Sequence, residues 1–199
     1  MASNDTKNIL LVGVGGQGTI LASNILSTGL ISLGYDVKMS EIHGMSQRGG
    51  NVSTQIRFGS KVNSPIVGKG EADVIVAFEK MEALRWVDYL RPNGSMIVND
   101  FVIPPLPVLT GAEIYPRGII EELEKKAAVT VIDAGGIAES LGNAKAMNVV
   151  LLGATIKALS EKMPDSFIKV DWAGIVSSTV KAQFVELNVK ALSEGMNLL

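Results

Sequence analysis

The chain has 199 residues, which is enough for one domain with a substantial core and too few for two large ones. Hydrophobic residues make up 47% of it but aromatic residues only 5%, so we expect an aliphatic core of the kind found around buried parallel sheets. A net charge of −2 without a basic stripe argues against a nucleic-acid partner, and the absence of cysteine excludes disulfides, cysteine nucleophiles, thiolate zinc sites and iron–sulfur clusters held by this chain.

The first predicted element is a strand at residues 9–12 that ends in a cluster of glycines. Residues 1–7 before it are polar, and the apolar run is too short for a signal peptide or a membrane span. We therefore expect a cytoplasmic protein without a membrane partner. A helix is predicted over residues 17–33, because leucines recur on one face and Gly34 gives a stop signal.

The turn between this strand and this helix contains four glycines in six residues, Gly13-Val14-Gly15-Gly16-Gln17-Gly18. Its spacing fits G-x-G-x-x-G, in which the first glycine allows a tight turn, the second lets a pyrophosphate approach, and the third lets helix and strand pack closely. The N–H groups at the helix start then face the anion. The pattern predicts a phosphate- or nucleotide-binding turn; the alternative is a compact turn without a ligand.

The second unusual segment is the loop at residues 42–50, between predicted strands at 35–41 and 51–58. Strict alternation of apolar residues in the later strand predicts that it is half-exposed and antiparallel to its neighbours. In a doubly wound sheet, the loop lies at the carboxyl edge beside the glycine turn. We therefore expect the two loops to face one crevice.

This loop carries the sole histidine of the chain, His43, together with Ser46, Gln47 and Arg48 between glycines. Glycines let the backbone approach a ligand, and the Arg48 guanidinium can hold a carboxylate or phosphate with two hydrogen bonds. The alternatives are a solvated or capping role for His43 and a surface ion pair for Arg48. The density of donors and glycines in this loop favours a binding role.

The rest of the chain alternates between strand-like and helix-like segments. Pro104, Pro105 and Pro107 predict an extended connector, since proline cannot pair within a central strand. From residue 145 onward the chain is predicted to be helical. We expect the apolar stripe at residues 173–191 either to pack on its own domain or to cover a partner subunit. The other predicted elements are strands at 74–78, 95–99 and 129–132, helices starting at 81 and covering 120–127, and turns at 91–94 and 133–136.

This order of elements predicts a single α/β domain at residues 1–199, with a three-layer, Rossmann-like, mostly parallel sheet, one antiparallel element and a helical C-terminal part.

Three further candidates for functional residues are weaker. The turn at 133–136 could reach the crevice, and Asn148 could cap or hydrogen-bond a neighbouring loop, or contact a ligand. One histidine and no cysteine leave little for a transition metal, so we expect no metal site. A solvated helix face best explains the acidic residues Glu121, Glu122 and Glu124.

Three motifs together resemble a known family. They are Gly13-Val14-Gly15-Gly16-Gln17-Gly18, His43-Gly44-Met45-Ser46-Gln47-Arg48-Gly49-Gly50 and Ala72-Asp73-Val74-Ile75-Val76-Ala77. They resemble the gamma subunit, or domain III, of the 2-oxoacid:ferredoxin oxidoreductases over nearly the whole chain. The histidine-containing motif is closest in form to that of the small beta subunit of indolepyruvate ferredoxin oxidoreductase, whereas other branches carry a different sequence before Arg-Gly-Gly.

The resemblance implies a division of labour between subunits. The family decarboxylates a 2-oxoacid on thiamine diphosphate, passes electrons through 4Fe-4S clusters to ferredoxin and leaves the acyl group on coenzyme A. A larger partner subunit would carry the thiamine diphosphate and the clusters, and this chain, inactive alone, would line the coenzyme A and substrate side. Its predicted cofactor-binding residues are Gly13, Gly15, Gly16, Gln17, Gly18, His43, Ser46, Gln47, Arg48, Gly49 and Gly50; none of them is expected to be catalytic.

Two alternatives remain open. The first is a free-standing NAD(P)-dependent dehydrogenase, in which Glu41 would hold the ribose, although no Tyr-x-x-x-Lys pair follows it. The second is a noncatalytic structural subunit whose glycine turn no longer binds a ligand, with the C-terminal apolar stripe forming an obligate interface.

Overall fold

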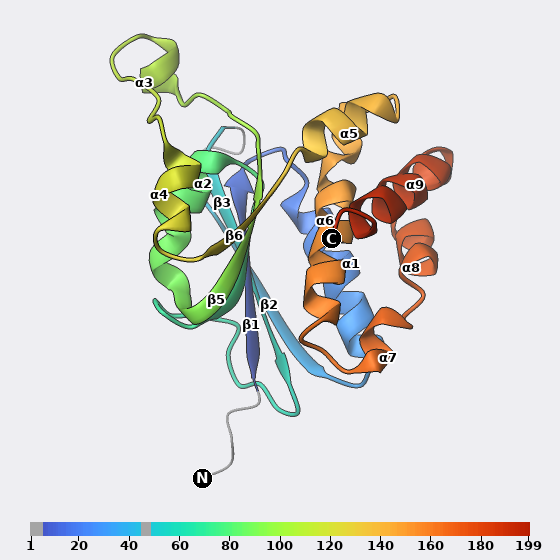
Figure 1. Ribbon diagram of the computed structural model, residues 1–199. Coiled ribbons are helices and arrows are strands. Elements are labelled where there is room, and N and C mark those ends of the chain that lie inside the picture. Colours follow the sequence, from blue (N-terminus) through green and yellow to red (C-terminus); the bar gives the residue numbers. More distant parts are fainter. Residues whose placement is uncertain (1–5, 45–48) are drawn as a thin grey trace.

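The structure, a computed structural model, describes residues 6–44 and 49–199. A six-stranded sheet forms its centre, in the order β2-β3-β1-β4-β5-β6 (Figure 1). β1, β4, β5 and β6 pair parallel, whereas β3 pairs antiparallel to both β1 and β2, which confirms the predicted mostly parallel sheet with one antiparallel element. The strands are β1 (Lys7–Val14), β2 (Asp36–His43), β3 (Asn51–Gly59), β4 (Ala72–Ala77), β5 (Leu90–Asn99) and β6 (Ala128–Ile132).

Helices cover both faces of the sheet, with α2 and α4 on one face and α1, α6, α8 and α9 on the other (Figure 1). The described helices are α1 (Thr19–Ser32), α2 (Lys80–Trp86), α3 (Leu106–Leu109), α4 (Ile119–Glu124), α5 (Ala134–Ser140), α6 (Met147–Ser160), α7 (Asp165–Ile168), α8 (Trp172–Thr179) and α9 (Val185–Met196), with short 3₁₀ helices η1 (Val87–Tyr89), η2 (Ala144–Ala146) and η3 (Ala182–Phe184). Within residues 6–44 and 49–199, no helix is long and apolar enough to cross a membrane.

Two separate hydrophobic cores lie on the two faces, which confirms the three-layer prediction. Successive residues of a strand point to opposite faces, so an unbroken apolar run fills both cores. In β1, Ile9 and Leu11 belong to the core shared with α1 and α6. Leu10 and Val12 belong to the core shared with α2 and α4.

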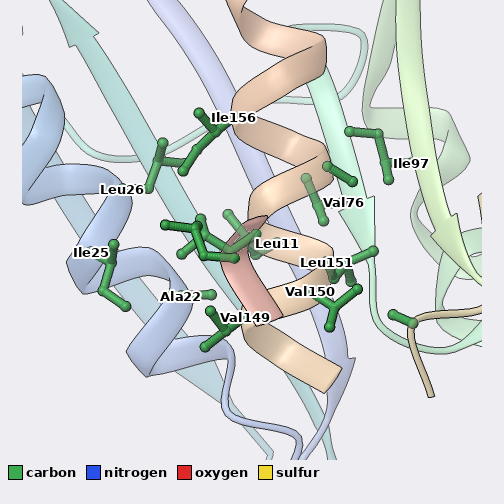
Figure 2. Packing of buried hydrophobic residues seen from close by; sticks show 14 of the residues in the cluster. Leu11, Ala22, Ile25, Leu26, Val76, Ile97, Val149, Val150, Leu151 and Ile156 are labelled. Carbon is green, nitrogen blue, oxygen red and sulfur yellow. The ribbon is translucent and has the colours of Figure 1, made fainter. Parts of the chain in front are cut away.

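The larger core contains the helical C-terminal part. Leu11 and Val76 of the sheet lie near Ile25 of α1 and Leu151 of α6 (Figure 2). α9 lies directly on α6, and a Cβ atom added at Gly195 would collide with the backbone of α6. The apolar stripe at 173–191 therefore packs on its own domain. It does so as two helices and a connecting turn, because the backbone becomes extended at Val180 and ends α8.

The prediction that β3 is half-exposed is wrong, although its antiparallel pairing is confirmed. Its polar side chains are covered by the segment that follows the strand. The Gln55 carbonyl oxygen accepts from the Val67 N–H at 2.6 Å, and the Arg57 guanidinium donates to the Ile66 carbonyl at 2.9 Å. Alternation in this strand therefore separates apolar from hydrogen-bonded positions, both of them largely buried.

Three local predictions also need correction. Residues 91–94 are not a free turn but lie inside β5, where the pairing register with β4 shifts and Asn93 adopts a φ of 63°. Residues 133–136 begin α5, with Asp133 as its N-cap, so the helical part starts before residue 145. The proline connector is extended only in part, because Pro107 lies within the short helix α3.

Candidate functional site

The glycine turn joins the end of β1 to the start of α1, and its shape is set by its own residues. Gly16 and Gly18 have φ values of 101° and 80°, which favour glycine. The side chain of Gln17 turns inward: its carbonyl oxygen accepts from the Val14 N–H at 2.7 Å, and its amide donates to the Phe78 carbonyl at 2.8 Å. Gln17 thus holds the turn between β1 and the end of β4.

Gly13, which lies within β1, leaves room for the side chains of Gln17 and Phe78. A Cβ atom there would lie 2.8 Å from the carbonyl oxygen of Gln17 and 3.0 Å from the Cβ of Phe78. A side chain at this position would therefore push Gln17 away and open the turn. Gly13 does not line the cavity described below.

The N-terminus of α1 has no cap from the part of the chain that the structure describes. Gly18 occupies the N-cap position, no side chain accepts from the first turn, and that turn contains no acidic residue. Among the described residues, the N–H groups of Gly16, Gly18 and Thr19 have no acceptor. Free N–H groups at the positive end of a helix dipole are chemically suited to bind an anion.

The histidine-containing loop connects β2 to β3, so it is the loop of a β-hairpin. His43 pairs with Val52 at its base, and the Gly44 N–H donates to the Asn51 carbonyl at 3.1 Å. A second hydrogen bond ties the loop to the glycine turn, since the Gly15 N–H donates to the Gly50 carbonyl at 2.8 Å. The predicted contacts Ser46, Gln47 and Arg48 lie outside the described residues.

A cavity of about 540 Å³ lies between the glycine turn and the ends of β2 and β3. The structure thus brings predicted residues from both loops around one space, and it adds Glu41, the residue that the dehydrogenase alternative requires. Thr19, Ile20 and Val52 were not predicted; the first two begin α1 directly after the glycine turn, and Val52 lies here because β3 pairs antiparallel beside β1. The lining residues are Gly15, Gly16, Gly18, Thr19, Ile20, Glu41, His43 and Val52.

Asn148 of α6 contacts the other side of the turn. Its amide donates to the Gly18 carbonyl at 3.2 Å, which matches the predicted hydrogen bond to a neighbouring loop. A Cβ atom at Gly18 would collide with this amide, so Gly18 allows α6 to approach α1. Asn148 is only 5% exposed, and its carbonyl oxygen has no partner among the described residues.

The remaining weak candidates have structural explanations. Asp133 accepts from the Gly136 N–H at 2.8 Å and so caps α5. Glu122 forms ion pairs with Lys125 and Lys126 on the exposed face of α4. In the described ranges, no group of three or more histidine, cysteine, aspartate or glutamate residues is placed to hold a metal ion.

A buried carboxyl group after the end of β4 was not predicted. Glu79 is fully buried and caps α2 by accepting from the Glu82 N–H at 3.0 Å. It also accepts from the Ile103 N–H at 3.3 Å and from the Tyr115 hydroxyl. Burial, followed by this hydrogen bond, raises the pKa of Tyr115 above its usual range. Glutamate is not a preferred N-cap, so no sequence pattern indicated this role.

Comparisons with known proteins agree on one family. The family model of pyruvate ferredoxin/flavodoxin oxidoreductase matches residues 8–198. The indolepyruvate oxidoreductase subunit IorB of Pyrococcus horikoshii is 37% identical over 95% of this chain and 94% of its own length, and that of Archaeoglobus fulgidus is 40% identical over 96% and 94%. A solved 2-oxoglutarate:ferredoxin oxidoreductase from Magnetococcus marinus, with 2-oxoglutarate, coenzyme A and succinyl-CoA bound, matches with a TM-score of 0.71 and 18% identity over 98% of this chain and 31% of that one.

Proposed function

Because the chain belongs to the pyruvate ferredoxin/flavodoxin oxidoreductase family, we propose that it is the small subunit of an indolepyruvate-type 2-oxoacid:ferredoxin oxidoreductase. Support for the substrate comes from the two relatives named as indolepyruvate oxidoreductase subunits, which align over nearly their full lengths. The reaction is the oxidative decarboxylation of an aryl pyruvate to its acyl-CoA. In this role residues 1–199 form one domain, and the complex works in the cytoplasm.

The chemistry that breaks and forms bonds belongs to a larger partner subunit. This chain has no cysteine, so it offers no thiolates to 4Fe-4S clusters. Thiamine diphosphate and the clusters, bound by the partner, would supply decarboxylation and electron transfer to ferredoxin. The role left for this chain is to bind and orient coenzyme A and to border the active site of the assembly.

The observation that carries this role is the uncapped N-terminus of α1 on the 540 Å³ cavity. The N–H groups of Gly16, Gly18 and Thr19 would hold the pyrophosphate, while Gln17 and Gly13 keep the turn in shape. His43 also lines this cavity, and Ser46, Gln47, Arg48, Gly49 and Gly50 complete the proposed contacts. The bound coenzyme A in the 2-oxoglutarate enzyme of similar fold supports this choice of ligand.

The first experiment purifies the chain from its native cells under gentle conditions and identifies what comes with it. We expect a larger subunit that contains thiamine diphosphate and iron, and ferredoxin reduction that depends on indolepyruvate and coenzyme A. If the chain emerges alone and holds a nicotinamide nucleotide, the dehydrogenase alternative replaces the proposal. The position of Glu41 on the cavity is the observation that favours this alternative.

A second experiment tests the coenzyme A site in the assembled complex. Gly16→Asp places a carboxylate beside the proposed pyrophosphate, while Gly16→Asn places a neutral group of the same shape there; a Cβ atom at Gly16 meets nothing within 4 Å. We expect coenzyme A to bind at least about tenfold more weakly to the aspartate variant than to the asparagine variant. Equal affinities in a complex that still assembles would favour the noncatalytic structural subunit.

A further inference from the structure

The segment between β5 and α4 projects from the body of the molecule as an apolar arm, residues 104–114, which contains α3 (Figure 1). Leu106, Leu109 and Ile114 of the arm are 71%, 69% and 87% exposed, the highest values for large hydrophobic side chains among residues 6–44 and 49–199. No residue of α3 is buried. A cluster of exposed, large apolar side chains is typical of a surface that another molecule covers.

The arm has a fixed shape although it packs little on its own domain. The buried Glu79 carboxylate accepts from the Ile103 N–H at 3.3 Å and from the Tyr115 hydroxyl, and these two residues lie on either side of the arm. Within the arm, the Glu113 N–H donates to the Pro107 carbonyl at 3.0 Å, and three prolines restrict the backbone. The arm is therefore ordered before it binds, so little conformational entropy is lost when its side chains are covered.

The composition of the arm indicates what kind of molecule covers it. Residues 101–112 contain no charged side chain, and Glu113 is the one charged residue of the arm. Nucleic acids and anionic membrane surfaces attract lysine and arginine side chains, which the arm lacks. The centre of a protein–protein interface is poor in charged residues. The arm therefore fits an apolar groove on another protein.

Three observations favour the larger partner subunit over a second copy of this chain. β1, β4 and β5 run parallel, so the arm leaves the same edge of the sheet at which the glycine turn and the 540 Å³ cavity lie. A standard interface uses about 20–30 residues on each side, more than the arm provides, so the arm needs a partner that also contacts its surroundings. In the 2-oxoglutarate enzyme of similar fold, the matched region is 31% of the chain, so there this fold is joined to a larger remainder.

We propose that the arm inserts into an apolar groove of the larger, thiamine-diphosphate-containing subunit and anchors this chain to it. This inference rests on the proposed function and extends it to the surface that holds the complex together. The groove would cover Leu106, Leu109 and Ile114. Glu79 is a positioning residue, because it holds both ends of the arm.

The test adds the full chain to the larger subunit identified by the first experiment and measures their dissociation constant by calorimetry. We expect Leu106→Lys and Leu109→Lys each to raise it at least about thirtyfold, because an unpaired ammonium group would be buried in an apolar groove. Both positions are exposed in the free chain, so its urea denaturation should not change.

Ile31→Lys is the matched control. Ile31 is 59% exposed near the end of α1, at the opposite edge of the sheet, so this variant should bind the larger subunit as wild type does. If Leu106→Lys and Leu109→Lys also bind it as wild type does, the inference is overturned. It is overturned as well if the chain alone forms a dimer in sedimentation velocity that Leu109→Lys dissociates, since the arm would then contact a second copy.

The outcomes separate this inference from the proposed function. If the complex oxidises indolepyruvate but the arm variants assemble normally, the proposed reaction stands and the inference about the arm does not. If the arm variants fail to bind a thiamine-diphosphate-containing subunit whose complex oxidises only other 2-oxoacids, the arm stands as the contact and the proposed substrate does not.

Discussion

Two kinds of helix N-terminus lie at the carboxyl edge of the sheet. α2 follows β4 and α5 follows β6, and each is capped by a carboxyl group just before it: Glu79 accepts from the Glu82 N–H, and Asp133 accepts from the Gly136 N–H. α1 follows β1 in the same direction, yet its N-cap is Gly18, and no side chain from residues 6–44 or 49–199 caps it. Three helices thus begin in equivalent places with opposite local chemistry.

We interpret this difference as one between two structural caps and a proposed binding site. A capping carboxylate satisfies the first N–H groups and complements the helix dipole, which adds about 1 kcal/mol of stability. At α1 this contribution is absent from the described chain, and a cavity lies there instead. Substitutions at the capped helices should therefore change stability without changing ligand binding, and substitutions at the glycine turn should change both.

The largest expected effect is at the cap of α2. Glu79→Ala removes a buried group that accepts from two N–H groups and the Tyr115 hydroxyl. We expect the free energy of unfolding in urea to fall by about 3 kcal/mol, and Tyr115→Phe to lower it by about 1 kcal/mol. Coenzyme A affinity of the folded protein should remain unchanged in both variants. A large loss of affinity with little loss of stability would show that this region belongs to the binding site.

A pair of glycine substitutions tests the uncapped turn. Gly16 and Gly34 both have positive φ values, 101° and 86°, and a Cβ atom at either meets nothing within 4 Å. Gly16→Ala and Gly34→Ala should therefore each cost about 1–2 kcal/mol of unfolding free energy through backbone strain. Only Gly16→Ala should weaken coenzyme A in titration calorimetry, since Gly34 lies at the far end of α1. Equal weakening by both would mean that strain, and not the site, controls affinity.

A smaller effect is expected at the cap of α5. Asp133→Ala should lower the free energy of unfolding by about 1 kcal/mol, and Asp133→Asn should restore most of the loss, because asparagine caps nearly as well. Urea denaturation of the two variants measures this directly. A loss of coenzyme A binding in Asp133→Ala would indicate that the start of α5 belongs to the binding site.

The smallest effect concerns Glu82, whose pKa is raised mainly by burial, against an opposing effect of Arg85. With a raised pKa, the folded protein keeps this proton where the unfolded chain has lost it. The free energy of unfolding therefore falls as the pH rises from about 4.5, the ordinary pKa of glutamate, through the raised pKa of Glu82. Glu82→Gln should unfold like wild type near pH 4 and be more stable near pH 8, by under about 1 kcal/mol. If the unfolding free energies of Glu82→Gln and wild type change in parallel with pH, this prediction is contradicted.

Elements that follow one another directly in the chain could be predicted from the sequence. The strand, the glycine turn and the helix of β1–α1 are consecutive, so spacing alone placed them correctly. The burial of β3 was missed because its polar face is covered by the segment after it, which forms hydrogen bonds to Gln55 and Arg57. A hydrogen bond from Asn148 to a neighbouring loop was predicted, but its partner, Gly18, lies 130 residues earlier in the chain, and no local pattern identifies it.

The hydrogen bond from the Gly15 N–H to the Gly50 carbonyl joins the turn and the β2–β3 loop into one unit. We expect a ligand that shifts the turn to change this contact with Gly50, and therefore the free energy of contacts that the loop makes. Thermodynamic linkage makes this effect reciprocal. If a partner subunit contacts the loop, coenzyme A should change the dissociation constant of the partner by the same factor as the partner changes that of coenzyme A. In the proposed complex, one backbone hydrogen bond would then couple coenzyme A binding in this chain to the contact with its partner subunit.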